Sequence, residues 1–224
     1  MARKFKKSKV SICVFCEGES EQAYIDFLKS EFHDVAVFKR PSSPGLFDDA
    51  DNRFKKDPGY RNYVDAIDEI WFFFDVEEKD IGNWTNRLEI IKRLRKLRKD
   101  PKIRVRLLMT TGCIEYWLML HYRHLAPSLL TVPDKERMLA QVVHMEPTYR
   151  KGNYDATARI AQNYPTAVKN ATIVLQNLLQ EGMPAWKILT NGIVGCVRNV
   201  RHFPLCKKPL FSLRAYKTKI VSNY

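Results

Sequence analysis

Residues 70–78 read Ile-Trp-Phe-Phe-Phe-Asp-Val-Glu-Glu, and this stretch decides the fold class. The five bulky apolar residues at its start are typical of a buried strand, which ends at Asp75. Residues 10–16, Val-Ser-Ile-Cys-Val-Phe-Cys, are a second run of β-formers, and Glu17 ends it in the same way. The sequence therefore predicts two buried strands that each stop at an acid.

The rest of the first half alternates between strand and helix patterns. Short apolar runs predict further strands at 35–38 and 103–109. Helices are expected from residue 21 onward, with Ser20 as a candidate cap, and at 60–68, 83–99 and 113–122, with a turn-rich loop at 41–59. Strands that alternate with helices favour an α/β fold, with a mainly parallel four-stranded sheet flanked by helices.

From residue 125 onward the pattern is mostly helical. Helices are predicted at 133–145, 155–163 and 165–180. The last 43 residues contain eight Lys or Arg and no acid. We therefore expect an α/β domain over residues 1–124 and a helical, basic C-terminal region over residues 125–224 that completes a groove.

The chain is strongly basic. Its 38 Lys and Arg outnumber its 25 Asp and Glu, which gives a formal net charge of +13. A positive field of this size favours a polyanionic partner, because each neutralised phosphate releases condensed counterions. The alternative is a protein that is basic without binding a polyanion. Nucleic acid is the partner that we expect.

The sequence favours a cytoplasmic location. No apolar run approaches the roughly 20 residues that a membrane-spanning helix needs. The basic residues 1–9 are followed by an apolar stretch that is too short for a signal peptide. Cys13 and Cys16 lack the second cysteine pair of a zinc site, so we expect the five cysteines to be reduced and mostly buried, with zinc as the weaker alternative.

Three acids follow directly on the two most apolar strands. Glu17 comes after residues 10–16, and Asp75 and Glu77 come where the strand at 70–74 ends. The carboxyl ends of parallel strands form one edge of a sheet, where ligands bind in open α/β folds. Carboxylates gathered there repel one another unless a cation such as Mg²⁺ or Mn²⁺ neutralises them. For any single acid, the alternative is an ordinary strand-end turn residue.

Three blocks of the sequence resemble the RloB-like proteins, a family with Toprim domains. Residues 16–21, Cys-Glu-Gly-Glu-Ser-Glu, and the helix after them resemble the Toprim opening motif in its RloB-like form. Residues 74–77, Phe-Asp-Val-Glu, resemble the Asp-x-Asp motif, with a glutamate in place of the second aspartate. Residues 112–122, Gly-Cys-Ile-Glu-Tyr-Trp-Leu-Met-Leu-His-Tyr, resemble the family's third block, although Thr111-Gly112 stands where the family has Asn-Pro.

The resemblance implies a Toprim fold that binds Mg²⁺ at the acidic edge of its sheet. It implies that Glu17 is the acid of the first motif, which acts as general base or lies beside the metal. Asp75 and Glu77 carry over as metal ligands, and Glu21 as a further one. The family is linked to phage defence, often beside an ATPase encoded by a neighbouring gene, and the resemblance implies such a partner here.

Two residues of the third block have two interpretations each. Glu115 matches the family's acid and is our fourth candidate catalytic residue, but a helix dipole also favours an acid at this position. His121 matches the family's histidine. A packed core histidine explains it at least as well as a catalytic one.

Two basic segments are candidates for contact with nucleic acid. Residues 87–106 contain ten Lys or Arg, among which we select Arg93 and Lys96. The C-terminal tail mixes basic and aromatic residues, which suits single-stranded or looped nucleic acid. Its candidates are Arg198, Arg201, Lys207 and Lys208. The alternatives are a solvated helix face for the first segment and a loosely ordered tail for the second.

Taken together, these features predict a metal-dependent nuclease that cleaves phosphodiester bonds in DNA or RNA, tRNA included. A Toprim-like module that binds nucleic acid or an ATPase without cutting is the alternative from another class. A primase- or topoisomerase-like strand transfer is a further alternative, but none of the ten tyrosines has a context that marks it as a nucleophile. The oligomeric state is left open.

Overall fold

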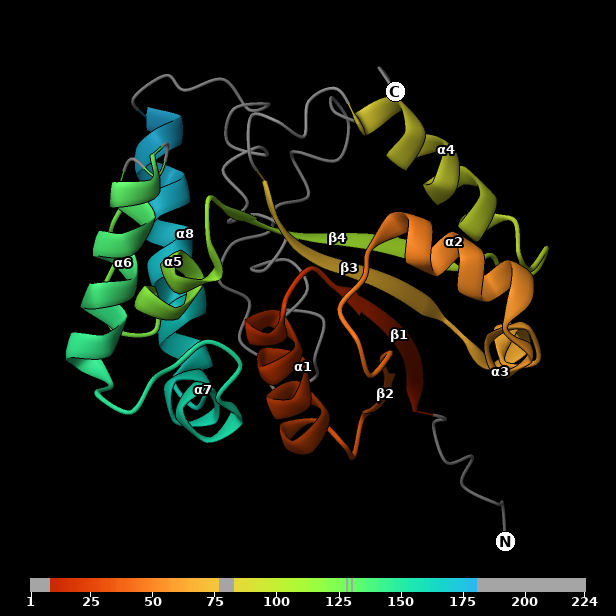
Figure 1. Cartoon of the computed structure of the whole chain (residues 1–224), viewed down its shortest axis with the longest axis horizontal. Helices are drawn as coiled ribbons and strands as arrows, with labels where there is room; N and C mark the ends of the chain where they lie inside the picture. Colours follow the sequence, from red (N-terminus) through yellow and green to blue (C-terminus); the bar gives the residue numbers. More distant parts are fainter. Residues whose placement is uncertain (1–8, 77–82, 128, 130, 181–224) are drawn as a thin grey trace, which may run out of the picture.

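The structure is a computed structural model that describes residues 9–76, 83–127, 129 and 131–180 (Figure 1). Its elements in chain order are β1 (Val10–Cys16), α1 (Glu19–Glu31), β2 (Ala36–Lys39), α2 (Phe47–Lys56), α3 (Pro58–Arg61), the 3₁₀ turn η1 (Val64–Ala66), β3 (Glu69–Val76), α4 (Trp84–Arg95), β4 (Arg104–Thr111), α5 (Ile114–Met119), α6 (Val132–Met145), α7 (Tyr154–Ala161) and α8 (Tyr164–Gln180).

The four strands form one parallel sheet in the order β2-β1-β3-β4. The register places Cys16 of β1 beside Phe73 of β3, and Asp75 of β3 beside Thr110 of β4. The carboxyl ends of β1, β3 and β4 therefore meet at one edge of the sheet. This arrangement confirms the predicted α/β class with a four-stranded parallel sheet flanked by helices.

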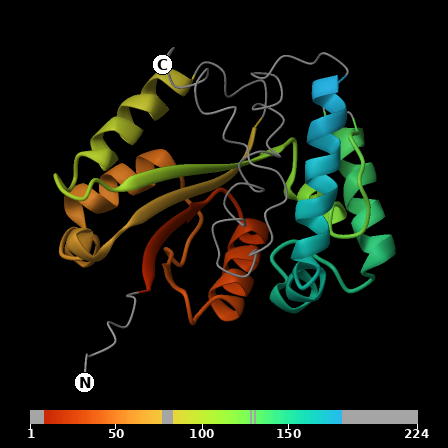
Figure 2. The same ribbon diagram turned by 180° about the vertical axis from the view of Figure 1, so that it is seen from behind.

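The side chains of β3 alternate between two hydrophobic cores. Trp71 and Phe73 belong to the core that α1 and the C-terminal helices cover, whereas Phe72 and Phe74 belong to the core under α2 and α4. Figure 1 and the reverse view in Figure 2 show these two groups of helices on opposite sides of the sheet. Because both faces of β3 are buried, its apolar run is unbroken.

Helix α2 occupies part of the segment that was predicted to be a loop, residues 41–59. Phe47, Ala50 and Phe54 are its buried residues, and they follow one another at helical spacing. The Phe47 ring stacks on the Phe72 ring of β3 with centroids 4.2 Å apart. The loop prediction was wrong because tertiary packing of this apolar face outweighs the weak helix propensity of the Asp and Asn residues between.

Two further predictions, one of a helix and one of a helix cap, were also wrong. The helix predicted at 60–68 is replaced by the end of α3 and the short turn η1. Ser20 does not cap α1, because Gly18 is the N-cap residue and Ser20 lies inside the helix. Instead, Ser20 Oγ accepts a hydrogen bond of 3.2 Å from the N–H of Gly152, which ties the start of α1 to the segment between α6 and α7.

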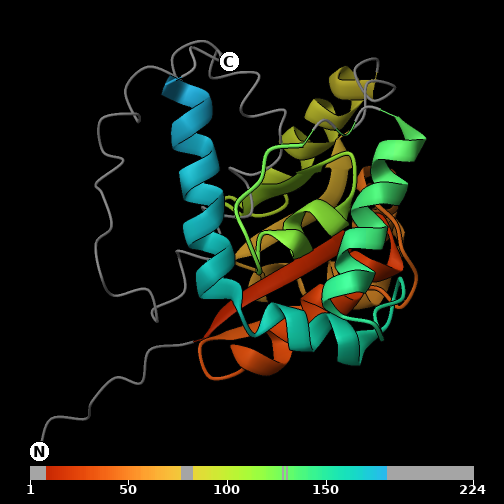
Figure 3. The same cartoon turned by 90° about the vertical axis from the view of Figure 1, so that its left-hand side faces the viewer.

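The helices after residue 125 share a hydrophobic core with α1. α7 packs against α1, and α5 contacts both α6 and α8. In the side view of Figure 3, α5 lies between α8 and α6. The helices predicted at 133–145, 155–163 and 165–180 are confirmed as α6, α7 and α8. The division into two domains near residue 124 stays a prediction.

Cys13, Cys16 and Cys113 are free and buried, as predicted for reduced thiols. Burial raises the pKa of Cys13 and Cys113 to about 12, so both stay protonated and unreactive near neutral pH. Cys196 and Cys206 lie outside the described residues. Among the helices in the described part of the chain, none combines the length and the apolar character needed to cross a membrane.

Candidate active site

Glu17 and Asp75 meet where the two central strands end. The N–H of Glu17 donates to the carbonyl of Phe73 at 3.0 Å, so β1 remains hydrogen-bonded to β3 one residue beyond its end. The N–H of Asp75 in turn donates to Glu17 Oε2 at 2.8 Å. The structure thus brings together two of the acids that the sequence placed at the carboxyl edge of the sheet.

Glu21 projects from the first turn of α1 and is only 4% exposed. Gly18 leaves space for it, because a Cβ at residue 18 would lie 2.9 Å from Glu21 Oε2. Burial raises the pKa of Glu21 to about 8, and the charge of Asp75 is the second cause. Glu17 and Glu115 raise this pKa further. A cation beside Glu21 would favour the charged form of its carboxylate.

Asp75 is half-buried, and its carboxylate accepts a hydrogen bond from the Thr110 hydroxyl of β4. Burial raises the pKa of Asp75 to about 7, although the bond from Thr110 opposes the rise. The negative charges of Glu17 and Glu115 add to the rise, and the positive charge of Lys135 on α6 reduces it. The strongly perturbed pKa values of Asp75 and Glu21 are typical of functional sites.

Glu115 lies in the first turn of α5 and is 1% exposed. The Tyr149 hydroxyl donates to Glu115 Oε1 at 3.2 Å, and Lys151 Nζ lies 3.9 Å from the same oxygen. A buried carboxylate needs such a donor and counter-charge. Its burial and its effect on two neighbouring acids distinguish Glu115 from an ordinary exposed acid at a helix start. We use the term acidic cluster for Glu17, Glu21, Asp75 and Glu115.

Sequence reasoning missed Tyr149 and Lys151, which lie between α6 and α7. The hydrogen bond from Gly152 to Ser20 holds this segment against α1. Gly152 has a φ of 76°, and a Cβ there would lie 2.9 Å from Glu19 Oε2, so the position requires glycine. Tyr149 is fully buried, whereas the Lys151 side chain is 66% exposed. Lys151 therefore lies where the acidic cluster meets solvent.

His121 lies in the core. It is 1% exposed, and its Nε2 and the Tyr24 hydroxyl are 3.2 Å apart. Its Nδ1 lies 3.0 Å from the carbonyl of Trp117. Burial lowers the pKa of His121 to about 4, so the ring is neutral at physiological pH. The structure favours the interpretation of a packed core histidine.

Five of the candidate residues lie outside the described residues, and their roles stay predictions. They are Glu77, which is expected to be a metal ligand, and the four tail residues Arg198, Arg201, Lys207 and Lys208.

The basic segment 87–106 spans the full length of the sheet. Helix α4 begins near the carboxyl edge of the sheet and runs toward the opposite edge. Arg104 therefore starts β4 at that opposite edge, beside Glu69. Arg104 and Arg106 both form ion pairs with Glu69 there. These two arginines therefore stabilise the start of the sheet, far along the strands from the acidic cluster.

The two selected bases of α4 differ in their surroundings. Arg93 forms an ion pair of 2.8 Å with Asp51 of α2, and Asp51 also pairs with Lys55. Lys96 is exposed at the C-terminal end of α4. Arg93 thus links two helices, and Lys96 is the more accessible of the two for a phosphate group.

The donor set of the acidic cluster suits a hard cation, because all its ligand atoms are carboxylate oxygens. Within residues 9–76, 83–127, 129 and 131–180, no three His, Cys, Asp or Glu side chains form a ready metal-binding group. Magnesium usually takes only one or two protein carboxylates and fills its remaining positions with water and substrate. Asp75 and Glu21, whose pKa values are raised by burial and by neighbouring charge, fit such a site.

Fold and site together define an α/β protein with an acidic cluster at the carboxyl edge of a parallel sheet. A family model described as RloB-like protein matches residues 12–191. The match covers most of the 224 residues, so the chain belongs to the RloB-like family. No curated protein and no solved structure gave a significant match to the chain.

Proposed function

We propose that this protein is a Mg²⁺-dependent nuclease of the Toprim class, which hydrolyses phosphodiester bonds in DNA or RNA. The observation that carries the proposal is Glu21, an acid that is 4% exposed and whose pKa is raised to about 8 by burial and by Asp75. Buried acids that repel one another lower the stability of the folded protein, so their presence together is typical of a functional site that binds a cation. The net charge of +13 supports a polyanionic substrate.

Each residue of the cluster has a role in the proposal. Asp75 and Glu21 would hold the cation, with Glu77 as the further ligand that the family motif implies. When bound, Mg²⁺ orients water and substrate phosphate and stabilises the charge of the phosphoryl transition state. Glu17, fixed by the N–H of Asp75, accepts the proton of the attacking water.

Two groups outside the motifs complete the site. Tyr149 fixes the Glu115 carboxylate through its hydroxyl, and Glu115 in turn holds the Lys151 ammonium at 3.9 Å. Lys151 is exposed on its other side, so its charge is available to a phosphate oxygen of the substrate. A cation at this place stabilises the negative charge that builds up during phosphoryl transfer.

Membership in the RloB-like family supports a biological setting for this activity. The proposal is cleavage in the bacterial cytoplasm during anti-phage defence, together with an ATPase partner encoded by a neighbouring gene. Such a partner would control when the nuclease cuts, because an unregulated nuclease would damage its own cell. Cleavage by the two purified proteins with and without ATP tests this part.

The experiment that tests the proposed function is incubation of the purified protein with duplex DNA, single-stranded DNA, total RNA and tRNA. Each substrate is tested in Mg²⁺ and in EDTA, alone and with the ATPase encoded beside the gene. We expect cleavage of at least one substrate in Mg²⁺ and none in EDTA. Binding without cleavage under all these conditions would contradict the proposal and identify a non-cleaving nucleic-acid-binding module.

A further inference from the structure

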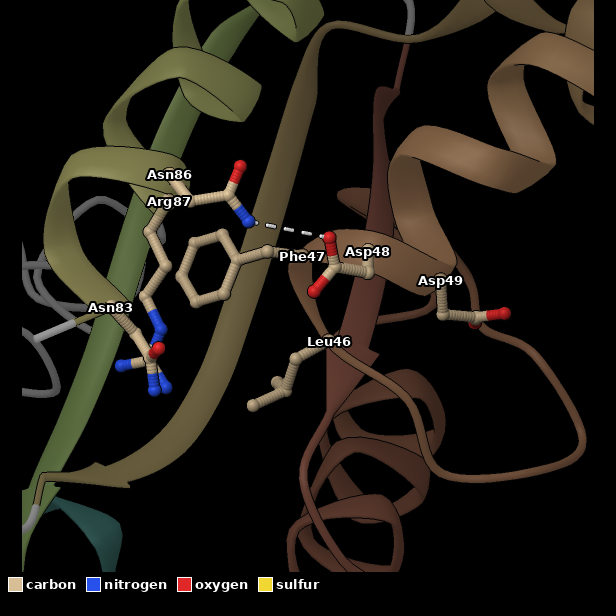
Figure 4. A pocket seen from close by; sticks show the side chains of 7 residues that line it. All are labelled: Leu46, Phe47, Asp48, Asp49, Asn83, Asn86 and Arg87. Atoms are coloured by element: carbon tan, nitrogen blue, oxygen red, sulfur yellow. Dashed lines mark hydrogen bonds between the residues drawn. The ribbon is translucent and has the colours of Figure 1, made fainter. Parts of the chain in front are cut away.

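A hollow of about 230 Å³ lies between the starts of α2 and α4 (Figure 4). Leu46 and the first three residues of α2 line it on one side, and Asn83, Asn86 and Arg87 line it on the other. The hollow is smaller than the roughly 300–1,000 Å³ of sites for drug-sized ligands, so its size suits one small group.

The hollow lies on the other face of the sheet from the acidic cluster but at the same end. Phe74, whose ring lies 5.5 Å from the Arg87 guanidinium carbon, directly precedes Asp75 in β3. The N–H of Gly45 donates to the carbonyl of Cys16 at 2.8 Å, and Cys16 directly precedes Glu17. The residues around the hollow are thus linked to the ends of both strands that carry Glu17 and Asp75.

One wall of the hollow contains the Arg87 guanidinium, which lies close to several aromatic rings. The Arg87 guanidinium carbon lies 5.2 Å from the Phe47 ring centre and 5.3 Å from that of Trp84. Phe47 is itself 3% exposed and stacked on Phe72, so its position is fixed. Cation–π contacts of this kind hold a guanidinium in place, and its planar face is a surface on which a base can stack.

The rim of the hollow carries hydrogen-bonding groups. Asp48, Asn83 and Asn86 are all exposed, and Asn86 Nδ2 lies 3.5 Å from Asp48 Oδ1, at the limit of a hydrogen bond. Asp49 differs, because its carboxylate forms an ion pair of 2.7 Å with Arg53 and points away from the hollow in Figure 4. Asp48 therefore supplies the acceptor, and the two asparagines supply both donors and acceptors.

These groups select the chemistry of the ligand. The Asp48 carboxylate would repel a phosphate, although two helix starts and an arginine would otherwise attract one. A flat ligand with its own N–H donors and carbonyl acceptors meets all the groups present. Among nucleobases, guanine carries two adjacent donors, N1–H and N2–H, that match a carboxylate, and acceptors at O6 and N7 that match amide or guanidinium N–H groups.

We propose that this hollow binds an unpaired guanine base of the nucleic-acid strand whose phosphate lies at the acidic cluster. The inference rests on the proposed nuclease function for its substrate class and adds a base preference to it. The guanine stacks on Arg87, donates to Asp48 and accepts from Asn83 or Asn86. The site selects strands with an unpaired guanine close to the cleaved bond.

The test measures equilibrium binding of labelled eight-nucleotide strands in EDTA, so that no cleavage is needed. One strand is all adenine, and the other carries a single central guanine. We expect the guanine strand to bind about tenfold more tightly, which lies within the range of discrimination that one bidentate contact provides. Asp48→Asn should abolish the preference, because the amide replaces an acceptor oxygen with a donor.

The matched control is Asp155→Asn, which changes an exposed acid at the same position of the first turn of α7. This variant should keep the tenfold preference, and Arg87→Lys should lower guanine binding while keeping the charge. Equal binding of the two strands by the wild type would overturn the proposal, as would a preference that survives Asp48→Asn. Binding of free GMP without a preference between strands would also overturn it. A guanine preference without cleavage in Mg²⁺ would support the guanine site and contradict the proposed nuclease function instead.

Discussion

The N–H of Asp75 donates a 2.8 Å hydrogen bond to the carboxylate of Glu17, and this bond links the two acids at the ends of the two central strands. It holds one acid of the first motif beside the first acid of the second motif. The two acids repel each other, and the Glu17 charge helps to raise the pKa of Asp75. The fold therefore maintains a repulsion that a bound cation would relieve.

The first prediction concerns pH and the stability of the metal-free protein. Burial, above all, raises the pKa of Glu21 and of Asp75 above their ordinary values of 4.5 and 3.8. Between about pH 4 and pH 8 the folded state thus binds more protons than the unfolded chain, and stability falls as the pH rises. Glu21→Gln should raise the melting temperature in EDTA by at least about 2 °C near pH 8.5 and change it little near pH 5.

The measurement is a thermal melt followed by circular dichroism at the two pH values. Glu136→Gln on α6 is the control, because Glu136 is exposed and should change the melting temperature little at either pH. An equal effect of Glu21→Gln at both pH values would show that the charge of Glu21 does not strain the folded state.

The second prediction concerns Lys151. If its ammonium contacts the substrate phosphate, Lys151→Gln should lower the single-turnover cleavage rate by about 10²-fold, in the range found for loss of one transition-state contact. Lys151→Arg should retain part of the rate, because it keeps the charge. Lys169→Gln, which changes an exposed lysine of α8, should cleave like the wild type. A wild-type cleavage rate for Lys151→Gln would show that Lys151 does not contact the substrate and only pairs with Glu115.

The third prediction concerns Tyr149. Tyr149→Phe removes the hydroxyl that donates to the buried Glu115 carboxylate at 3.2 Å. Loss of a donor to a buried group costs about 1–3 kcal/mol, so the free energy of unfolding in urea should fall by that amount. Tyr154→Phe is the control, because Tyr154 is 41% exposed and should leave stability nearly unchanged. Equal stabilities of the two variants would contradict the role assigned to the Tyr149 hydroxyl.

The fourth prediction concerns the basic residues of α4. Each phosphate contact contributes about 0.9 to the salt dependence of duplex binding. Lys96→Ala should therefore lower this slope by about 0.9 if Lys96 contacts phosphate. Arg93→Ala should lower it less, because Arg93 is held by Asp51 at 2.8 Å. An unchanged slope for the Lys96→Ala variant would show that the end of α4 is not part of the nucleic-acid interface.

The sheet could be predicted because its strands carry strong local signals. Residues 70–74 are apolar on both faces, and both cores of the protein receive side chains from them. Helix α2 also has a signal, the spacing of Phe47, Ala50 and Phe54, but the turn-forming residues around it favoured a loop. Its stability comes from packing on β3, which sequence spacing alone does not reveal.

The site was predictable where acids follow strands or lie in a motif that resembles the family. Glu17 and Asp75 were found because each ends an apolar run, and Glu115 because it begins a helix in a motif that resembles the family. Tyr149 and Lys151 carry no such mark, since they lie 34 and 36 residues after Glu115 in a segment without a motif. The packing of α7 on α1 and the hydrogen bond from Gly152 to Ser20 bring them to the acidic cluster.

The measurement that tests the central claim most directly is the cleavage rate of Asp75→Asn in Mg²⁺ with the substrate that the wild type cuts. The amide is isosteric with the carboxylate and can still pair with Thr110, so the fold should be kept. The account predicts a rate lowered by at least about 10²-fold, with an unchanged circular dichroism spectrum, while the control Asp155→Asn cleaves normally. An Asp75→Asn variant that cleaves at the wild-type rate would contradict the assignment of the acidic cluster as the catalytic site.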